Sequence, residues 1–478
     1  MSNFQLIKKL PKSYWVANIM ELFERWAYYG LFAVLALYLT QSKESGALGF
    51  TQGEKGILMG TVAGVLYFLP VITGALADRF GYKRTLVIAY IILCSGYFFM
   101  GQVTDYTAFF LIFLYTAIGA ALFKPVISAT IARTTNDATA SIGFGIFYMI
   151  VNIGAFIGPV FAAKLRVISW NYVFMISSGI ILINILILLL FFKIPERVKN
   201  EDSFFYSIKK ALLNVVSVIF DFRFLFFLLI IIGFWAMYFQ LFYSLPVFID
   251  QWVDTRVIYN VFESLSPSLA QFLGTKTETI APEMIISIDT MYIIIFQILV
   301  STYVIRFKPL KTMIGGIFLA SVGLAFWFVT RNGLFLFGSI LLFALGEMAC
   351  SPKISQYIGK IAPADKTALY MGTSFIPLAG GNFLAGFLSG DVYTQIADKT
   401  YLLKQYLYSH NINIRCTDGE LFDKACTQLN VNHQQLTDIL WNAQHPWIIF
   451  IVYSGIGFIT ALVLFLYDKF ILSKPINK

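Results

Sequence analysis

Apolar runs of roughly 20 residues recur along the whole of this 478-residue chain. About 20 residues of helix cross the roughly 30 Å hydrocarbon core of a bilayer. A helix also satisfies its own backbone hydrogen bonds, whereas an open strand edge finds no partner in lipid. The sequence therefore predicts an all-α membrane protein with twelve transmembrane helices, at 14–40, 54–77, 84–102, 106–132, 141–165, 170–192, 224–249, 286–305, 312–330, 334–359, 367–390 and 446–468.

The composition and the distribution of charge agree with a lipid environment. Hydrophobic residues make up 58% of the chain and charged residues 13%, which is too little polar surface to cover a water-soluble protein. With the N-terminus inside, the cytoplasmic connections carry more than twice as many Lys and Arg residues as the opposite side. The positive-inside rule then places both termini in the cytoplasm and the protein in the cytoplasmic (inner) membrane. The net charge of +9 is thus a feature of topology, and we expect no nucleic-acid partner.

The twelve spans fall into two halves with a polar stretch between them. We expect a six-helix bundle at 1–192, a cytoplasmic linker at 193–223 and a second six-helix bundle at 224–478. Within the linker, 203–220 is expected to form an amphipathic helix on the membrane surface. Spans four and ten share a fragment, which supports an internal duplication. The fragment pairs Gly119, Pro125, Ile127 and Ser128 with Gly346, Pro352, Ile354 and Ser355 at the same spacing.

The segment 391–445 is long and polar for a connection, and we expect it to form an insertion outside the membrane. Asp418, Asn432 and Gln435 are placed like helix-capping residues and predict two small helices. Cys416 and Cys426 either pair in an oxidising compartment or stay free, and the sequence leaves both alternatives open. We assign this insertion no transport chemistry.

Ionisable residues inside the predicted spans are the strongest functional signal. Each costs at least about 2.5 kcal/mol to insert, so a chain keeps one where it faces water or a charged partner. Those that we single out are Glu21, Glu24, Arg25, Lys124, Asp289, Glu347 and Lys353. Glu21 and Arg25 lie four residues apart on one helix face, which Tyr28 and Tyr29 continue by a turn. The glutamates are natural partners for Arg25 and Lys124, either as a titrating, ligand-binding cluster or as a static staple between spans one and four.

Signatures of other function classes are missing from the sequence. No Ser/His/Asp cluster, metal-ligand spacing or G-x-x-x-x-G-K-[ST] loop is present, so we expect neither an enzyme nor an ATP-driven pump. His410, His433 and His445 lie in or beside the external segment, and we assign them no ligand role. No cofactor or metal is expected. A channel remains an alternative, which the repeat and the charges of the first span disfavour.

Four stretches resemble the motifs of one transporter group. Residues 21–30 read ELFERWAYYG and are similar to the ExxERFxYYG signature of the proton-dependent oligopeptide transporter (POT) family, a branch of the major facilitator superfamily. Residues 147–154 resemble its FYxxxNxG signature, and residues 346–363 resemble its GExxxSP…AP stretch. The loop between spans two and three resembles the superfamily's cytoplasmic gating motif through Gly74, Ala77, Asp78, Arg79, Gly81, Lys83 and Arg84.

The resemblance covers all twelve spans and implies two bundles around a central cavity, alternating access and proton-driven uptake. It assigns proton coupling to Glu21, Glu24, Arg25 and Lys124. Substrate binding would fall to Arg25, Tyr28, Tyr29, Tyr67, Lys124, Asn152, Trp235, Asp289 and Glu347. The expected cargo is a di- or tripeptide, whose carboxylate would meet Arg25, Lys124 and Asn152 and whose amine would meet Glu347. We expect a monomer.

Three positions depart from the family pattern. Phe239 stands where many members place a glutamate in span seven, four residues after Trp235. Phe32 occupies the position of a second family arginine. Asp289 stands where the family often has asparagine, and we expect it to replace the missing carboxylate in proton coupling. The alternative function is therefore a symporter of the same fold for an amino acid, an anion or another small metabolite.

Overall fold

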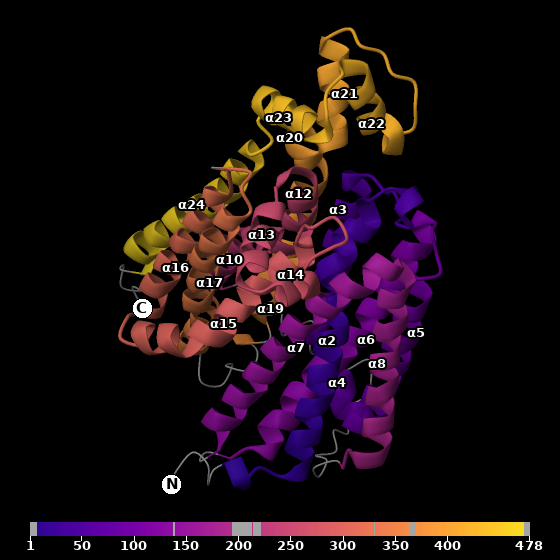
Figure 1. Cartoon of the computed structure of the whole chain (residues 1–478). Coiled ribbons are helices and arrows are strands. Elements are labelled where there is room, and N and C mark those ends of the chain that lie inside the picture. Colours follow the sequence, from indigo (N-terminus) through magenta and orange to yellow (C-terminus); the bar gives the residue numbers. More distant parts are fainter. Residues whose placement is uncertain are drawn as a thin grey trace. The chain divides into compact units, whose positions relative to one another are not determined.

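The computed structural model describes residues 7–136, 139–193, 213, 221–328, 330–362, 370, 371 and 373–472. This part of the chain consists of helices joined by short connections (Figure 1). Within the described ranges, β-structure is limited to two isolated bridges, Asp254 with Asn332 and Gly274 with Ile280. The predicted all-α class is confirmed, while the helix predicted at 203–220 lies outside the described residues.

The helices group into two compact units, here called the first and the second unit. The first comprises Met1–Phe32, Val62–Leu229 and Ser355–Gly380, and the second Ala33–Thr61, Ile230–Ile354 and Gly381–Lys478. Helices within the first unit are α4 (Pro70–Phe80), α5 (Tyr82–Met100), α6 (Tyr106–Thr134), α7 (Ala140–Ile168) and α8 (Trp170–Phe191). Helices within the second unit are α11 (Gln240–Tyr243), α12 (Leu245–Trp252), α13 (Arg256–Leu265), α14 (Pro267–Leu273), α15 (Pro282–Val304), α16 (Pro309–Ala325), α20 (Tyr393–Ala397), α21 (Lys399–Ser409), α22 (Asp418–Leu429), α23 (His433–Gln444) and α24 (Ile448–Tyr467). Helices with residues in both are α2 (Lys12–Thr40), α3 (Gln52–Phe68), α10 (Phe222–Tyr238), α17 (Leu334–Ile361) and α19 (Phe375–Phe387).

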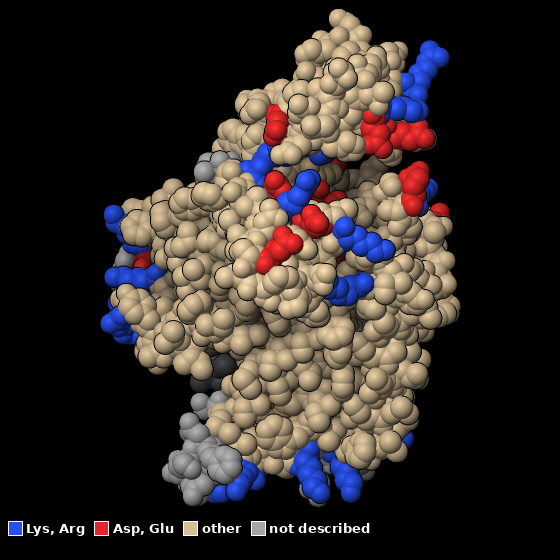
Figure 2. Space-filling view, in the orientation of Figure 1, with Lys and Arg blue, Asp and Glu red and all other residues tan. Residues whose placement is uncertain are grey.

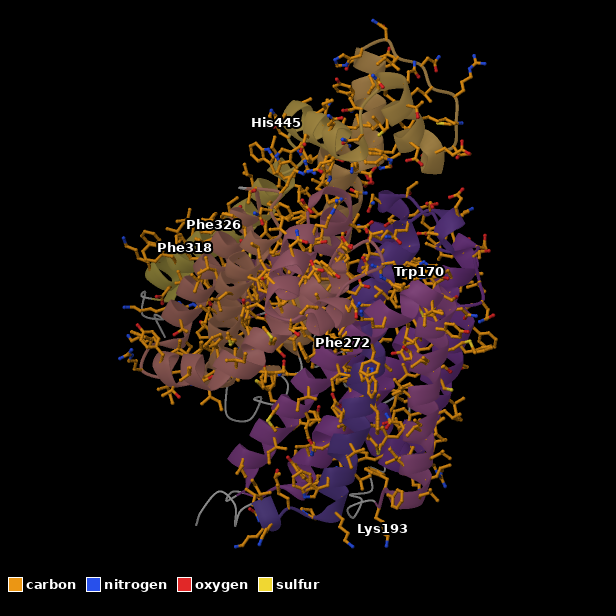
Figure 3. All side chains as sticks on the ribbon, in the orientation of Figure 1. Trp170, Lys193, Phe272, Phe318, Phe326 and His445 are labelled. Atoms are coloured by element: carbon orange, nitrogen blue, oxygen red, sulfur yellow. The ribbon has the colours of Figure 1, made fainter. Side chains whose placement is uncertain are left out.

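Eight helices among the described residues are long and apolar enough to cross a membrane. The shorter apolar helix α16 and the turn after it also expose large apolar side chains: Phe318 and Phe326 are 55% and 46% exposed (Figure 3). Charged side chains are sparse across wide areas of each unit's surface, as lipid contact requires (Figure 2). The count of twelve spans, the domain boundaries and the cytoplasmic termini stay predictions.

Local sequence explains where the second predicted span breaks and ends. Pro70 starts α4 directly after α3, because proline has no backbone N–H to continue the α3 hydrogen bonds. Gly81 separates α4 from α5 with φ 88° and ψ 141°, a conformation that residues with a Cβ rarely adopt. The α4–α5 connection therefore needs glycine at position 81 of the gating motif.

The shared fragment of spans four and ten has equivalent packing roles. In the first unit, a Cβ added to Gly119 of α6 would lie 3.0 Å from the Ala89 carbonyl oxygen of α5. In the second unit, α17 approaches α16 in the same way, since a Cβ on Gly316 would lie 2.7 Å from the Gly346 carbonyl oxygen. Pro125 and Pro352 both lie inside their helices. These parallels support a duplicated origin of the two spans.

The insertion at 391–445 is helical and packed onto the second unit. Asn432 and Gln435 form a capping box at the start of α23, and α22 and α23 are the two small helices that the sequence predicts. The helix α21 is an addition, begun by the Asp398 side chain accepting from the Tyr401 backbone N–H. The Trp252 indole donates to the Ala397 carbonyl at 2.8 Å. Cys416 and Cys426 are both free.

Candidate functional site

The charged residues of α2 form a buried cluster in the first unit. Glu21, Glu24 and Arg25 are 4%, 0% and 5% exposed. Arg25 Nε lies 3.4 Å from Glu21 Oε1, and the guanidinium also forms an ion pair with Glu24. The second carboxylate oxygen of Glu24 has no hydrogen-bond partner within the part of the chain that the structure describes. One arginine is therefore the ion-pair partner of two acids, and Glu24 retains a buried acceptor oxygen.

Aromatic rings lie against Arg25 and Lys124, the two cations of this cluster. The Arg25 guanidinium carbon lies 5.0 Å from the Tyr28 ring centre and 5.8 Å from that of Tyr29. The Lys124 ammonium of α6 lies 4.9 Å from the ring centre of Tyr67 on α3. Lys124 interacts through its charge with Arg25 and both glutamates, yet it forms no ion pair within 4 Å in the described part of the chain. The structure thus brings these residues together, with Arg25 as the direct partner of the acids.

A close crossing of α2 and α7 fixes the position of the cluster. A Cβ added to Gly154 would lie 2.8 Å from Arg25 Cβ and 2.9 Å from the Leu22 carbonyl oxygen. One turn on, a Cβ added to Gly158 would lie 2.6 Å from the Gly30 nitrogen. Asn152, 8% exposed, lies on the same helix and donates to the Tyr148 carbonyl at 2.8 Å. The motif glycines therefore permit backbone contact beside the charges.

Asp289 and Glu347 form a second buried group, in the second unit. Asp289 is 2% exposed and Glu347 9% exposed, and each has one carboxylate oxygen that finds no hydrogen-bond partner in the described ranges. Their helices meet one turn away, where Ile293 of α15 contacts α17 at Ala344 and Met348. The two carboxyl charges interact, and the Tyr238 hydroxyl hydrogen-bonds Glu347. Among the described residues no Lys or Arg pairs with either acid.

Aromatic residues occupy the positions where the family has charges. Phe239 is 4% exposed and lies 5.9 Å, centre to centre, from the ring of Trp235. The buried Trp235 indole N–H, beside Tyr238, has no hydrogen-bond partner among the described residues. In the first unit, Phe32 stacks on Tyr28 with ring centres 5.4 Å apart and planes at 13°. The lost charges are therefore replaced by ring packing.

The chain matches the family model of the Major Facilitator Superfamily over residues 15–386, well over half its length. The chain belongs to the major facilitator superfamily. Dipeptide and tripeptide permease B of Salmonella typhimurium is 32% identical over 202 residues, covering 40% of this chain and 39% of that protein. Dipeptide and tripeptide permease A of Citrobacter koseri is 24% identical over 432 residues, covering 80% and 84%. These matches confirm the resemblance to the POT family.

A solved structure shares the fold of this major facilitator protein along nearly its whole length. The crystal structure of a POT family transporter in complex with 5-aminolevulinic acid aligns with a TM-score of 0.70 and 16% identity, covering 97% of both chains. At this identity the likeness shows the fold alone. Across three curated relatives, the matched part of the chain spans only 33–39% of their length, so its cargo is a matter for proposal.

The buried charge of Lys55 was missed by sequence reasoning. Lys55 on α3 is 0% exposed in the second unit, and its ammonium donates to the Tyr243 carbonyl at 3.0 Å. The ring centre of Tyr393 lies 5.3 Å away. Its place at the very start of an apolar run is typical of a lysine at the membrane surface, so its burial could not be predicted from the sequence. Among the gating-motif residues, Lys83 donates to the Leu189 carbonyl at 3.3 Å.

Proposed function

We propose that this protein is a proton-coupled symporter that imports di- and tripeptides by alternating access. The observation that carries the proposal is the buried cluster of Glu21, Glu24 and Arg25. Intramembrane charges are costly, and a purely structural contact between helices is made more cheaply by small residues, which α2 and α7 already use. The dipeptide and tripeptide permeases among its relatives support the cargo.

Charge balance gives the first unit a way to couple a proton to a substrate carboxylate. Glu21, Glu24, Arg25 and Lys124 sum to zero when all are ionised. A proton taken up by either glutamate gives the cluster a net charge of +1 and weakens one ion pair of Arg25. Arg25 and Lys124 are then available to an anionic group, so that binding of the proton favours binding of the substrate carboxylate.

The second unit would carry the complementary chemistry. Asp289 and Glu347 lie in a buried setting without a cationic partner among the described residues, so full ionisation of both is costly. We assign to this pair a proton that moves with the transport cycle and a role in receiving the substrate amine. The indole N–H of Trp235, which has no partner in the part of the chain that the structure describes, would supply a donor for a peptide carbonyl.

The alternative cargo is a single small metabolite. Phe32 and Phe239 favour it, because both replace family charges by buried rings and reduce the charge available to a peptide. A related structure holds 5-aminolevulinic acid, a zwitterion other than a peptide. Thermal stabilisation of the purified protein by many unrelated dipeptides, each displacing the others, supports peptide transport. Stabilisation by one amino acid or anion alone would favour the alternative.

Uptake into proteoliposomes tests the coupling. A potential of 100 mV supplies about 2.3 kcal/mol per proton, and each pH unit adds about 1.4 kcal/mol. One pH unit combined with 100 mV therefore drives roughly hundredfold or greater accumulation. We expect uptake of a labelled dipeptide to follow both gradients. Uptake that is indifferent to an imposed pH gradient and voltage contradicts the proposal.

A further inference from the structure

A groove of about 570 Å³ opens on the second unit between α15, α16 and α17. Figure 1 shows these three helices side by side, and Phe296 and Leu345 pack against the same core cluster at the groove. Its volume lies within the roughly 300–1,000 Å³ of small-molecule sites. The lining is almost entirely apolar: Phe296, Leu299, Val300, Tyr303, Val304 and Phe307 from α15 and its end, with Gly315, Leu319, Leu345 and Ala349 among those facing them.

An exposed glycine, Gly315 of α16, is part of the lining of the groove. A Cβ added to Gly315 of α16 would meet no atom within 4 Å, whereas one added to the next residue, Gly316, would collide with α17. On the rim, Leu299 is 66% and Tyr303 59% exposed. The packing of these three helices therefore leaves an apolar groove that is accessible from outside the unit.

The groove has the length of one leaflet's acyl region. It follows α15 from Phe296 to Val304 and α16 from Lys311 to Leu319, which at 1.5 Å per residue is about 12 Å on each helix. Half of a roughly 30 Å hydrocarbon core is about 15 Å. One acyl chain lying along the helices would thus contact the groove over most of the thickness of one leaflet's hydrocarbon region.

Basic side chains gather at the end of the groove where α15 ends and α16 begins. Lys311 is part of the lining, and Lys308 and Arg306 precede it. The Arg306 guanidinium carbon lies 4.1 Å from the ring centre of Tyr303 and 5.3 Å from that of Phe307, and its Nε donates to the Tyr303 carbonyl at 3.1 Å. Both rings line the groove, so this cation is held at its mouth. Within the described ranges no carboxylate pairs with any of the three.

We infer that this groove binds an anionic glycerophospholipid, with an acyl chain along α15 and α16 and its phosphate at Arg306 and Lys311. Charge complementarity selects the occupant. The groove is apolar and ends at three basic side chains, which have no acidic partner among the described residues. An anionic headgroup with a hydrocarbon tail matches both features. Figure 2 shows Lys and Arg side chains predominating along the left edge of the second unit, in contrast to the mixed charges near α12 and α13. This inference depends only on the membrane setting and is independent of the transported cargo.

Native mass spectrometry of the delipidated full-length protein tests the site. The probes are phosphatidylglycerol and phosphatidylcholine with identical acyl chains, so that only the headgroup differs. We expect the first phosphatidylglycerol to bind several-fold more tightly than phosphatidylcholine. Lys311→Gln and Arg306→Gln should each weaken phosphatidylglycerol binding about fivefold, the equivalent of about 1 kcal/mol per basic residue.

Two glycine variants separate the groove from general contact with lipid. Gly315→Phe places an aromatic ring in the lining of the groove and should abolish the tightest phosphatidylglycerol binding. Gly338→Phe is the matched control, because Gly338 is an exposed glycine of α17 outside the groove whose added Cβ also meets nothing within 4 Å. Equal binding of the two lipids by the wild type overturns the inference. An unchanged preference in the Arg306→Gln/Lys311→Gln double variant overturns it as well, even if Gly315→Phe fails to fold.

Discussion

Replacing Arg25 by glutamine tests whether charge holds the α2 cluster together. Arg25 is the ion-pair partner of both Glu21 and Glu24, and all three residues are at most 5% exposed. Removing one partner from a buried ion pair costs about 3–5 kcal/mol, because the remaining charge loses its compensation. We expect Arg25→Gln to lower the free energy of unfolding by this amount, which is roughly two to nearly four powers of ten in the unfolding equilibrium.

Lys124→Gln is the control, since Lys124 contacts the Tyr67 ring and forms no ion pair in the described part of the chain. Loss of a cation–π contact predicts a cost of about 0.5–2 kcal/mol. Reversible unfolding in mixed SDS micelles, followed by tryptophan fluorescence, gives both values under the same conditions. The double variant Glu24→Gln/Arg25→Gln should recover part of the loss, as coupled neighbours do. If Arg25→Gln costs no more than Lys124→Gln, the ion pairs do not stabilise the cluster.

Three further predictions follow from the geometry. Gly154→Ala should lower the free energy of unfolding by about 1–3 kcal/mol, because the added Cβ collides with α2. Gly145→Ala on the same helix, where an added Cβ meets nothing, should be neutral or stabilising in the same unfolding assay. Equal effects of the two variants would contradict the close crossing of α2 and α7. Burial, with the nearby Arg331 charge, lowers the pKa of Lys399 to about 8. The unfolded chain therefore binds more protons than the folded one between about pH 8 and 10.4, and stability rises with pH in this window. The thermal midpoint of the wild type should then approach that of Lys399→Met as the pH rises. A difference between the two midpoints that stays constant with pH would refute the lowered pKa. Burial raises the pKa of the Cys426 thiol and so lowers its fraction of reactive thiolate. A maleimide should therefore label the partly exposed Cys416 first in the native protein. Equal labelling rates at the two cysteines would argue against the packing of α22.

Hydrophobic pattern and motifs were sufficient for the class of fold and for the composition of the first cluster. Runs of apolar residues predicted the helices, and the four-residue spacing of Glu21 and Arg25 predicted their ion pair, because both signals are local. The capping box at Asn432 and Gln435 was predictable for the same reason. Helix α21 was not expected, since its cap, Asp398, lacks a matching residue three positions on.

Contacts between distant residues were beyond sequence reasoning. The FYxxxNxG signature includes Gly154 and not Gly145, but it does not show that Gly154 lies against Arg25 while an added Cβ on Gly145 meets nothing. The sequence paired Lys124 with the glutamates, whereas the structure places its ammonium over Tyr67. The burial of Lys55 depends on a carbonyl 188 positions away. Each of these facts depends on how helices pack, which a helix's own periodicity does not encode.

Proton movement that accompanies the substrate tests the central claim most directly. Proteoliposomes containing the protein and a pH-sensitive dye inside are held without any ion gradient, and an unlabelled dipeptide is then added outside. We predict acidification of the lumen that saturates with dipeptide concentration and is abolished in Glu24→Gln. Dipeptide entry, measured in parallel with a labelled substrate, without any accompanying acidification would contradict proton-coupled symport by this protein.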